Sequence, residues 1–383
     1  MKSMFIEIET LTPIWTGGVK GSCDILHETG IIGSMRWWYE AIVRGLGGNA
    51  CDPTGRGCIF DKGEYDNAKN KGKNEHEALH NAKLCDVCQV FGATGWRRRF
   101  DLRIIHNNTE PAWKGEEMLK IRPPARSHGW FLSAGMVGRF TLKLQGDSDV
   151  IARLASLLLF LEEWGAIGAK PQLGYGFFKI NNREEIREYA MDWSKICTQI
   201  DSYDLHDLPN LPDLRQFTFF RYRFKPSHDD WWTWVKGLQR LLGDPKAASK
   251  LSQLAQMGII PVSPVLKNQW RYVEWPESLS TKRWIFGTSD QEKRRGKISI
   301  SWAYHEKDLW VVRGWAWLPE EERIKSGTIQ HRQEIDVLED ILKNELVWKK
   351  ALNLDNNSRT DLYVESLTNN DNDMIIKILR GKT

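Results

Sequence analysis

The stretch that decides the fold class is residues 164–178, Trp-Gly-Ala-Ile-Gly-Ala-Lys-Pro-Gln-Leu-Gly-Tyr-Gly-Phe-Phe. Its four glycines and Lys170 separate an apolar stretch from an aromatic one. Glycine allows φ above zero and lets a ligand approach the backbone closely, and amides beside an ammonium form a natural phosphate site. Neither G-x-G-x-x-G nor G-x-x-x-x-G-K-[ST] fits, so the nucleotide-binding glycine motifs are excluded. Two interpretations remain, an anion-binding loop and a tight helix-to-strand connection.

Hydrophobic periodicity around this loop predicts six elements in the order β-α-β-β-α-β. The expected strands cover residues 5–10, 100–106, 139–144 and 176–180. One helix is expected to begin with Ser34 as its N-cap, and the other covers 150–164. This order is the split unit of a ferredoxin-like, RRM-like sandwich.

The second half of the sequence repeats the order. Strands are expected at 217–224, 297–303, 309–317 and 374–379, and helices at 231–242 and 334–348. Residues 201–213, rich in Pro, Asp and Leu, predict a linker. We therefore expect an α+β protein of two tandem ferredoxin-like domains, 1–200 with a long insertion at 47–99, and 214–383. The second domain lacks a Gly-rich loop, because 353–373 are largely polar and contain no glycine.

Charge and aromatic content point to local rather than global features. The net charge of the 383 residues is only +4, but basic residues cluster at 97–99 and 293–295, as in the local footprint of a polyanion. Most of the nineteen tryptophans are expected in cores and domain interfaces, and a minority as platforms for stacked bases.

The compartment is predicted to be the cytoplasm. The N-terminus runs directly into a strand without a signal peptide, and the longest apolar run, 154–161, is too short to span a bilayer. Six cysteines without a secretory context favour a reducing compartment over a disulfide framework.

The cysteines of the insertion suggest a metal centre. Cys85-x-x-Cys88 has metal-ligand spacing, and Cys51 and Cys58 lie upstream in the same insertion. Four thiolates form a closed tetrahedral site for structural zinc, and a metal would order a segment with little apolar content. His76 and His80 are alternative ligands. A metal-free buried turn is the competing interpretation, whereas a redox C-x-x-C lacks its thioredoxin-like context.

Several of these motifs together resemble a known superfamily. They are Thr12-Pro13, Trp15-Thr16-Gly17-Gly18, Gly33-Ser34 before Arg36-Trp37-Trp38, Cys85-x-x-Cys88 before Phe91-Gly92, and the Gly-rich loop. The sequence resembles the RAMP proteins of CRISPR effector complexes, and its Gly-Ser-Met-Arg-Trp-Trp opening is most similar to the first subunit of the type III-B (Cmr) complex. The resemblance is specific over about residues 1–180 and weaker over 213–383.

The resemblance implies a non-catalytic RNA-binding subunit of a ribonucleoprotein for antiviral defence. Such a subunit lies near the 3′ region of the guide RNA and contacts guide RNA, target RNA and neighbouring RAMP subunits. The RNA contacts that we predict are Gly168, Lys170, Gln172, Gly174, Arg36, Arg44, Arg97, Arg98 and Arg99. For Arg36 and Arg44 the alternative is an ion-pair ladder with Glu40, and for Arg97–Arg99 it is a solvated loop.

Two other function classes stay open. Asp24 resembles, by position, an acidic residue that filament-forming RAMP subunits use in target cleavage. An endoribonuclease of this fold would also use a histidine as general acid or base, and His27, His106 and His128 are each isolated along the chain. The third class is a protein-only scaffold. We predict no catalytic residue.

Overall fold

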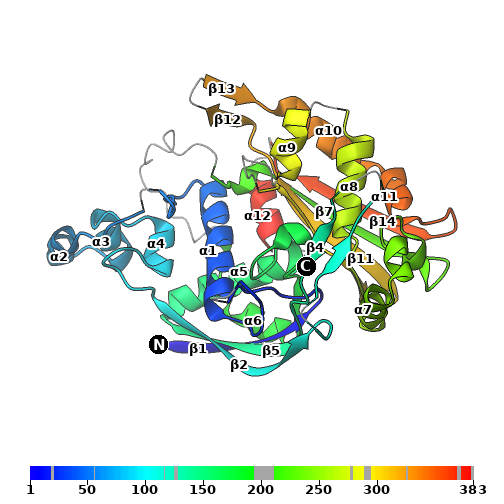
Figure 1. Ribbon diagram of the computed structural model, residues 1–383. Coiled ribbons are helices and arrows are strands. Elements are labelled where there is room, and N and C mark those ends of the chain that lie inside the picture. The colour runs from blue at the N-terminus through cyan, green and yellow to red at the C-terminus, as the bar shows by residue number, and fades with distance from the viewer. Residues whose placement is uncertain are drawn as a thin grey trace.

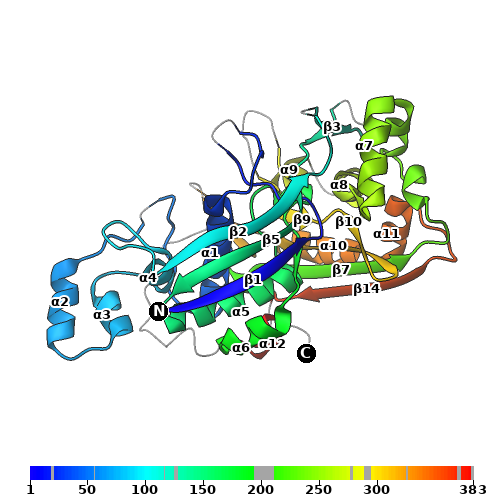
Figure 2. The same cartoon turned by 90° about the horizontal axis from the view of Figure 1, so that it is seen from below.

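The structure, a computed structural model, describes residues 1–18, 21–55, 57–115, 117–124, 128–193, 211–276, 279–288, 295–324, 327–368 and 372–380. The described part is a mixed α+β protein with several sheets, as expected from the sequence. Its layers alternate: a first sheet, a pair of helices, a second sheet and further helices (Figures 1 and 2). No described helix is long and apolar enough to cross a membrane.

The first half, residues 1–193, contains all six elements that its periodicity predicts. They are β1 (Lys2–Thr10), α1 (Glu28–Gly45), β2 (Phe100–Pro111), β5 (Met136–Gly146), α5 (Ser148–Trp164) and β6 (Phe178–Ile180). The sheet order is β2-β5-β1-β6, and every pairing is antiparallel. Helix α6 (Arg183–Tyr189) follows, and β3 (Leu119–Ile121) pairs with β4 (Trp130–Leu132) in a small separate sheet.

The predicted start of the first helix is wrong. Helix α1 begins at Glu28 with His27 as its N-cap residue. Ser34 lies inside the helix, where its hydroxyl donates to the carbonyl of Ile31 at 2.7 Å. A serine can bond to the backbone one turn earlier as well as cap a helix, so the residue type alone did not locate the helix end.

The insertion forms a lobe at one end of the molecule (Figure 1). It contains three short helices, α2 (Lys62–Asn70), α3 (Glu75–Asn81) and α4 (Asp86–Phe91). Only α4 is largely buried; α2 buries Ala68 alone. The lobe therefore gains little stability from its own apolar core.

The second half, residues 211–380, is built on a larger sheet. Its strands are β7 (Phe217–Lys225), β8 (Ile259–Ile260), β9 (Ile298–Ile300), β10 (Ala303–Glu306), β11 (Leu309–Trp317) and β14 (Arg359–Ser366), with a separate pair, β12 (Glu321–Ile324) and β13 (Gly327–Gln330). The order is β14-β7-β11-β10-β8, and β9 also pairs with β11. Its helices are α7 (Pro245–Gln256), α8 (Ser263–Gln269), α9 (Leu279–Phe286), α10 (Arg332–Lys343), α11 (Glu345–Leu352) and α12 (Asn372–Arg380).

Three predictions for this half are wrong in detail. The last strand is β14, which lies inside the polar stretch 353–373 that was expected to be a connection. Residues 374–379 belong instead to helix α12, whose apolar residues recur at helical spacing and are buried. Residues 231–242 form 3₁₀ turns, since Gly237 interrupts them with φ of 104°. The helix over 334–348 is divided at Asn344, whose side chain caps α11 by accepting from Leu346 N.

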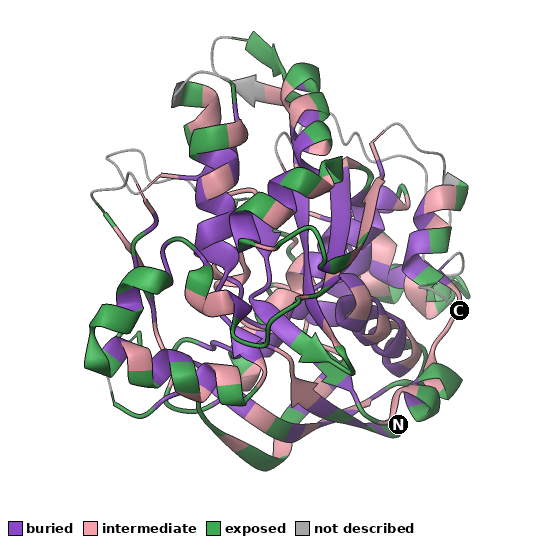
Figure 3. Cartoon of the chain, turned by 90° about the vertical axis from the view of Figure 1, so that its right-hand side faces the viewer, coloured by how far each residue is buried: buried purple, intermediate pink, exposed green. Residues whose placement is uncertain are grey.

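The hydrophobic core of the first half includes side chains from the second half. Trp38 of α1 is 2% exposed and packs on Phe217, Phe219 and Trp315 of the second sheet, with ring centroids 5.4, 6.4 and 4.8 Å away. Helix α12 closes on the core of the first half rather than its own. Figure 3 shows the buried residues gathered in these central strands and helices. Residues 201–210 of the predicted linker, with Lys293 and Arg294, lie outside the described residues.

Candidate nucleic-acid interface and metal centre

A cavity of about 810 Å³ lies where the Gly-rich loop of the first half faces strand β9 of the second. Helix α1 and the loop supply one wall, and residues from α9, β9 and β11 supply the other. The basic and aromatic side chains that line it are Lys170, Arg295, Lys297, Trp37, Trp284 and Trp317. The cavity thus joins cations and indole rings from segments far apart in the sequence.

Lys297 contacts two of the indole rings that line the cavity, those of Trp284 and Trp317, which together we call the aromatic wall. Its Nζ lies 4.5 Å from the ring centre of Trp317 and 4.9 Å from that of Trp284. Both distances are within the range of cation–π attraction. A cation held beside indole faces is the combination with which proteins hold the phosphates and stacked bases of single-stranded nucleic acid.

Stacking on His331 holds Trp284 in place. Trp284 is 5% exposed, and the two ring centroids are 3.7 Å apart with an interplanar angle of 18°. The Nε2 of His331 lies 3.3 Å from a carboxylate oxygen of Glu322, which also lines the cavity. The aromatic wall is therefore held in place by a second layer of contacts.

The Gly-rich loop is held by its own hydrogen bonds. The residues whose amides donate to oxygens of the protein are Gly165, Ile167, Gly168, Ala169, Leu173, Gly174 and Gly176. Positive φ values of 83° at Gly168, 93° at Gly174 and 90° at Gly176 shape the turn. The amides of Gly168 and Gly174, which are predicted to hold phosphate, both donate within the protein in this structure. The loop is a tight helix-to-strand connection.

The loop also joins the two halves. A Cβ on Gly174 would lie 2.3 Å from Cδ1 of Trp302, so the backbone approaches that indole closely. The backbone carbonyl of Gln172 accepts a hydrogen bond from the ammonium of Lys267. Burial lowers the pKa of Lys267 to about 7, which is the expected effect of removing an ammonium from water. The side-chain Oε1 of Gln172 is buried without a hydrogen-bond partner.

Lys170 is the charged residue among the predicted contacts that line the cavity, with Gly168 and Gln172. It adopts φ of 60° at the turn, and its Nζ lies 3.5 Å from the ring centre of Trp15. Burial lowers its pKa. Lys170 and Lys297 therefore line the same cavity from opposite halves of the chain.

Arg36 and Arg44 form a ladder with Glu40. The carboxylate of Glu40 is 2.9 Å from Arg36 Nε and 3.9 Å from Arg44 Nη2. Arg44 is 4% exposed and donates to the carbonyls of Ala50, Cys51 and Pro212. Arg44, a predicted RNA contact, is therefore buried in this structure, with its donors used by the protein. Arg36 is likewise engaged, by Glu40, by Gly92 O and by the sulfur of Cys88.

The three arginines at 97–99 lie outside the cavity wall. Arg99 pairs with Asp147 at 3.0 Å and Asp149 at 3.3 Å. Arg98 donates to the carbonyl of Phe100 and lies over its ring. Arg97 is exposed. Only Arg97 of the three keeps the solvated position from which a loop arginine reaches a phosphate.

The candidate catalytic residues are partly brought together. Asp24 is exposed, and its Oδ1 lies 3.9 Å from Nε2 of His27. His106 and His128 are exposed. Asp24 and His27 are three residues apart in the sequence, so their proximity is local, and His27 stands at the start of α1.

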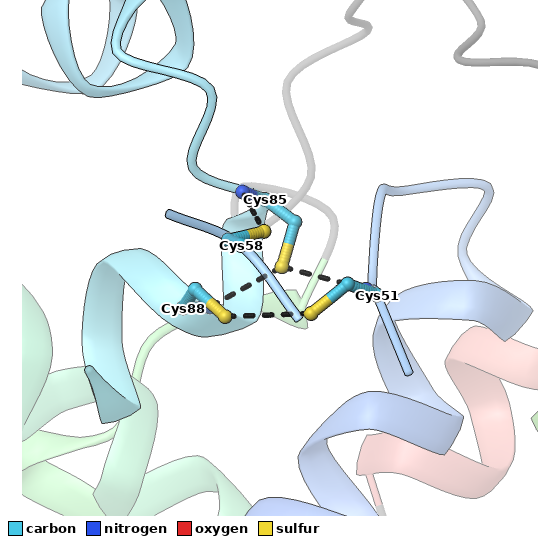
Figure 4. Close-up of side chains that lie close together, drawn as sticks. All are labelled: Cys51, Cys58, Cys85 and Cys88. Carbon is cyan, nitrogen blue, oxygen red and sulfur yellow. Dashed lines mark hydrogen bonds between the residues drawn. The ribbon is translucent and has the colours of Figure 1, made fainter. Parts of the chain in front are cut away.

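The four cysteines of the insertion meet as the spacing predicts. Their sulfurs all lie within 4.8 Å of one another, and those of Cys51 and Cys88 are 3.5 Å apart (Figure 4). The edge of a zinc–thiolate tetrahedron is about 3.8 Å, given bonds of about 2.3 Å. Hydrogen bonding among the four thiols lowers the pKa of Cys51 and raises the pKa of Cys85 and Cys88, so one thiolate is shared within the cluster.

Backbone amides surround these sulfurs. Cys85 N donates to the sulfur of Cys58 at 3.4 Å, and Cys88 N donates to that of Cys85 at 3.4 Å. Such outer contacts orient ligands and offset their charge. His76 and His80 are not part of this cluster: both point their Nε2 at Asp86 instead. Their expected role as alternative ligands of the cysteine site is therefore not supported.

The aromatic wall of the cavity was not predicted from the sequence. Trp284, Lys297 and Trp317 carry no local motif and come together only through the fold. The available signals were the high tryptophan count and the basic cluster at 293–295, of which Arg295 does line the cavity.

Three solved structures are similar to the chain. Cmr1 from Pyrococcus furiosus in its apo form matches at 14% identity and a TM-score of 0.38, over 89% of this chain and 97% of that one. A chain of a type III-B Cmr-beta complex bound to cognate target RNA and AMPPnP matches at 13% and 0.36, over 82% and 94%. A chain of a type IV-B CRISPR complex matches at 13% and 0.31, over 54% and 97%.

No curated protein matches the sequence. The family model that matches is that of the RAMP superfamily, and the match runs over residues 7–179. That span contains the first sheet, both of its helices and the Gly-rich loop. The similarity to the RAMP superfamily therefore covers residues 7–179, within the first half of the chain.

Proposed function

We propose that the chain is a non-catalytic, RNA-binding subunit of a type III-B CRISPR ribonucleoprotein, and that single-stranded RNA lies in the cavity between its halves. The observation that carries the proposal is the placing of Lys170 and Lys297 on opposite walls of one cavity, beside Trp317. The lysines supply charge for phosphates, and the half-buried indole of Trp317 supplies a stacking surface that accepts any base. Both kinds of contact are independent of sequence, as a protein that binds variable guides requires.

The strand orders support a duplicated architecture. Counted along each half, both sheets place their strands in the order fourth, first, third, second: β6-β1-β5-β2, and β14-β7-β11 followed by β9 or β10. That is the arrangement of a β-α-β-β-α-β sandwich, so we interpret the chain as two ferredoxin-like units. The cavity then lies between the two units.

The assignment to a type III-B complex rests on the RAMP domain together with the Gly33–Trp38 resemblance. On this basis we propose a cytoplasmic subunit that lies near the 3′ region of the guide RNA. Guide RNA, target RNA and neighbouring RAMP subunits are its partners. The affinity of Lys170 and Arg295 for phosphate would depend on salt, because bound cations release counterions from RNA.

We also propose that Cys51, Cys58, Cys85 and Cys88 hold a structural zinc ion. The sulfur positions and the surrounding amides support this, as does the small apolar core of the lobe. Metal analysis of the purified protein tests it: a Cys58→Ser variant should lose one equivalent of zinc. Equal zinc content in the variant and the parent protein would contradict the proposed cysteine site.

The RNA proposal is tested with end-labelled single-stranded RNA and the purified chain at two salt concentrations. The variant is Lys297→Met, which removes the charge and keeps the apolar stem. The matched control is Lys225→Met, an exposed lysine at the far end of β7 from the cavity. Weaker, less salt-sensitive binding in the first variant alone is expected, and equal binding by both variants would contradict the site.

An endoribonuclease is the second candidate, and the 3.9 Å separation of Asp24 and His27 favours it over other catalytic readings. A carboxylate beside an imidazole can support general acid–base chemistry at a 2′-hydroxyl. The same labelled RNA, run on a denaturing gel, distinguishes the two functions. RNA that stays full length supports the binding subunit, whereas shortening that Asp24→Asn abolishes would establish the nuclease.

A further inference from the structure

We propose a second metal site in the insertion, formed by His76, His80 and Asp86 and suited to Zn²⁺ or a similar divalent cation. Two imidazole nitrogens and one carboxylate oxygen are ligands that zinc takes in proteins. The three ligand atoms lie within 4.8 Å of one another. The site is distinct from the four-cysteine cluster and does not rest on the proposed RNA function.

Helix α3 positions the two histidines. His76 and His80 are four residues apart, so they occupy one face of the helix. The helix start is fixed by a capping box, in which the Asn74 side chain accepts from Glu77 N and the Glu77 carboxylate accepts from Asn74 N. The rings are 5.0 Å apart and present their Nε2 atoms to the same carboxylate.

The distances fit a coordination polyhedron. The Nε2 of His76 is 3.1 Å and that of His80 is 3.2 Å from one and the same oxygen, Oδ1 of Asp86. With metal–ligand bonds of about 2.0–2.1 Å, the edge of a tetrahedron is about 3.3 Å. A cation placed between the three atoms would therefore satisfy all of them without a large movement.

The third ligand is oriented as metal-binding carboxylates are. The second oxygen of Asp86, Oδ2, accepts a hydrogen bond of 2.8 Å from Asn49 N, a contact of the kind that fixes a ligand in place. The carboxylate is 1% exposed, whereas the His76 side chain is 27% exposed. The exposed side leaves room for water as a fourth ligand, because three protein ligands leave one tetrahedral position open.

The site would join two parts of the lobe. Asp86 opens helix α4 and stands between Cys85 and Cys88, so α4 would carry ligands for two metals. His76 and His80 belong to α3, which packs on α2 at the outer end of the lobe. The second cation would hold α3 to α4, and the cysteine site would hold α4 to the segment after α1. Its role is structural.

The experiment counts zinc in the full-length protein and in two variants. His76→Gln with His80→Gln keeps N–H donors for the Asp86 carboxylate but removes the imidazole ligands; Cys58→Ser removes a ligand of the other site. The parent chain should bind about two equivalents and each variant about one. Zinc content unchanged by the double glutamine variant would overturn the proposal and leave Asp86 as a hydrogen-bond acceptor only. A loss confined to that variant, with the cysteine variant unchanged, would support this site and refute the cysteine site.

A cobalt titration keeps the test valid where a variant folds poorly. Co²⁺ is added to the unmodified protein after it is freed of metal and given one equivalent of zinc, which the thiolates take in preference to the nitrogen and oxygen ligands. Weak d–d absorption without thiolate charge-transfer bands is expected, because the ligands of the second site are nitrogen and oxygen. The absence of any such absorption would count against the site.

Discussion

The indole Nε1 of Trp302 donates a hydrogen bond of 2.7 Å to the backbone carbonyl of Leu173. The bond ties the Gly-rich loop of the first half to the second half, and the neighbouring Gly174 lies against the same indole. The loop therefore acts as a joint between the halves in addition to lining the cavity. A change at this joint should affect stability and RNA binding together.

Gly174→Ala should destabilise the protein by about 3 kcal/mol or more, since it combines backbone strain with a steric clash. The new Cβ would lie 2.3 Å from Trp302, and φ there is 93°. Gly72→Ala is the matched control: its φ is 76°, but nothing lies within 4 Å of the added atom. Urea unfolding should show a loss of only about 1 kcal/mol for the control. Equal losses in the two variants would mean that the close contact with Trp302 is not a constraint.

Lys170→Met should weaken RNA binding about 3- to 10-fold at low salt. It should also lower the slope of log K against log salt by about one, because one phosphate contact is lost. Both residues are non-glycine and of similar length, so the backbone at φ of 60° stays equally strained. Filter binding at four salt concentrations measures the slope, with Lys225→Met as the control. An unchanged slope would exclude Lys170 from contact with phosphate.

Much of the first half could be predicted from the sequence, because its periodicity is strong. Leu142 and Leu144 alternate with polar residues, and the strand over 139–144 is confirmed within β5. The cysteine cluster could also be predicted, since C-x-x-C spacing brings two sulfurs close by local geometry alone. The strand β14 was not, because its residues are mostly half-buried and polar, and only pairing with β7 makes them a strand.

The pairing of Lys170 and Lys297 in one cavity could not be predicted from the sequence. Lys170 stood out because glycines surround it, but its partner Lys297 lies in the other half with no motif around it. The burial of Arg44 could not be predicted either. A basic residue on a helix is expected to face solvent, whereas Arg44 is buried and donates hydrogen bonds to three backbone carbonyls. Burial of charge depends on distant segments, which sequence periodicity does not describe.

Loss of the cysteine metal should open the insertion to proteolysis. The lobe has few buried apolar side chains, so its local stability depends on the metal. Cys58→Ser should raise the rate of tryptic cleavage within 62–83 by about tenfold, while the rest of the chain stays protected. Cys23→Ser, a thiol outside the cluster, is the control. Equal cleavage rates for the two variants would show that the lobe is ordered without the metal.

Glu163→Gln should destabilise the joint between the halves in a pH-dependent way. Glu163 of α5 lies 2.7 Å from Arg221 of β7, and both side chains are largely buried. Burial alone would raise the pKa of Glu163, but the charge of Arg221 and the hydrogen bond from it hold this pKa below the ordinary 4.5. A depressed folded pKa means that the ion pair stabilises the protein above pH 4.5, and that this contribution is lost as pH falls through the folded pKa.

The variant should therefore be less stable than the parent protein by about 1–3 kcal/mol near neutral pH. The difference should shrink as the pH falls below 4.5, because the parent carboxylate then becomes protonated and resembles the neutral amide. Urea unfolding at several pH values measures it. Glu184→Gln removes an exposed pair with Arg187 and should change stability by less than about 0.5 kcal/mol. A difference for Glu163→Gln that stays constant across this range would contradict a stabilising charge on Glu163.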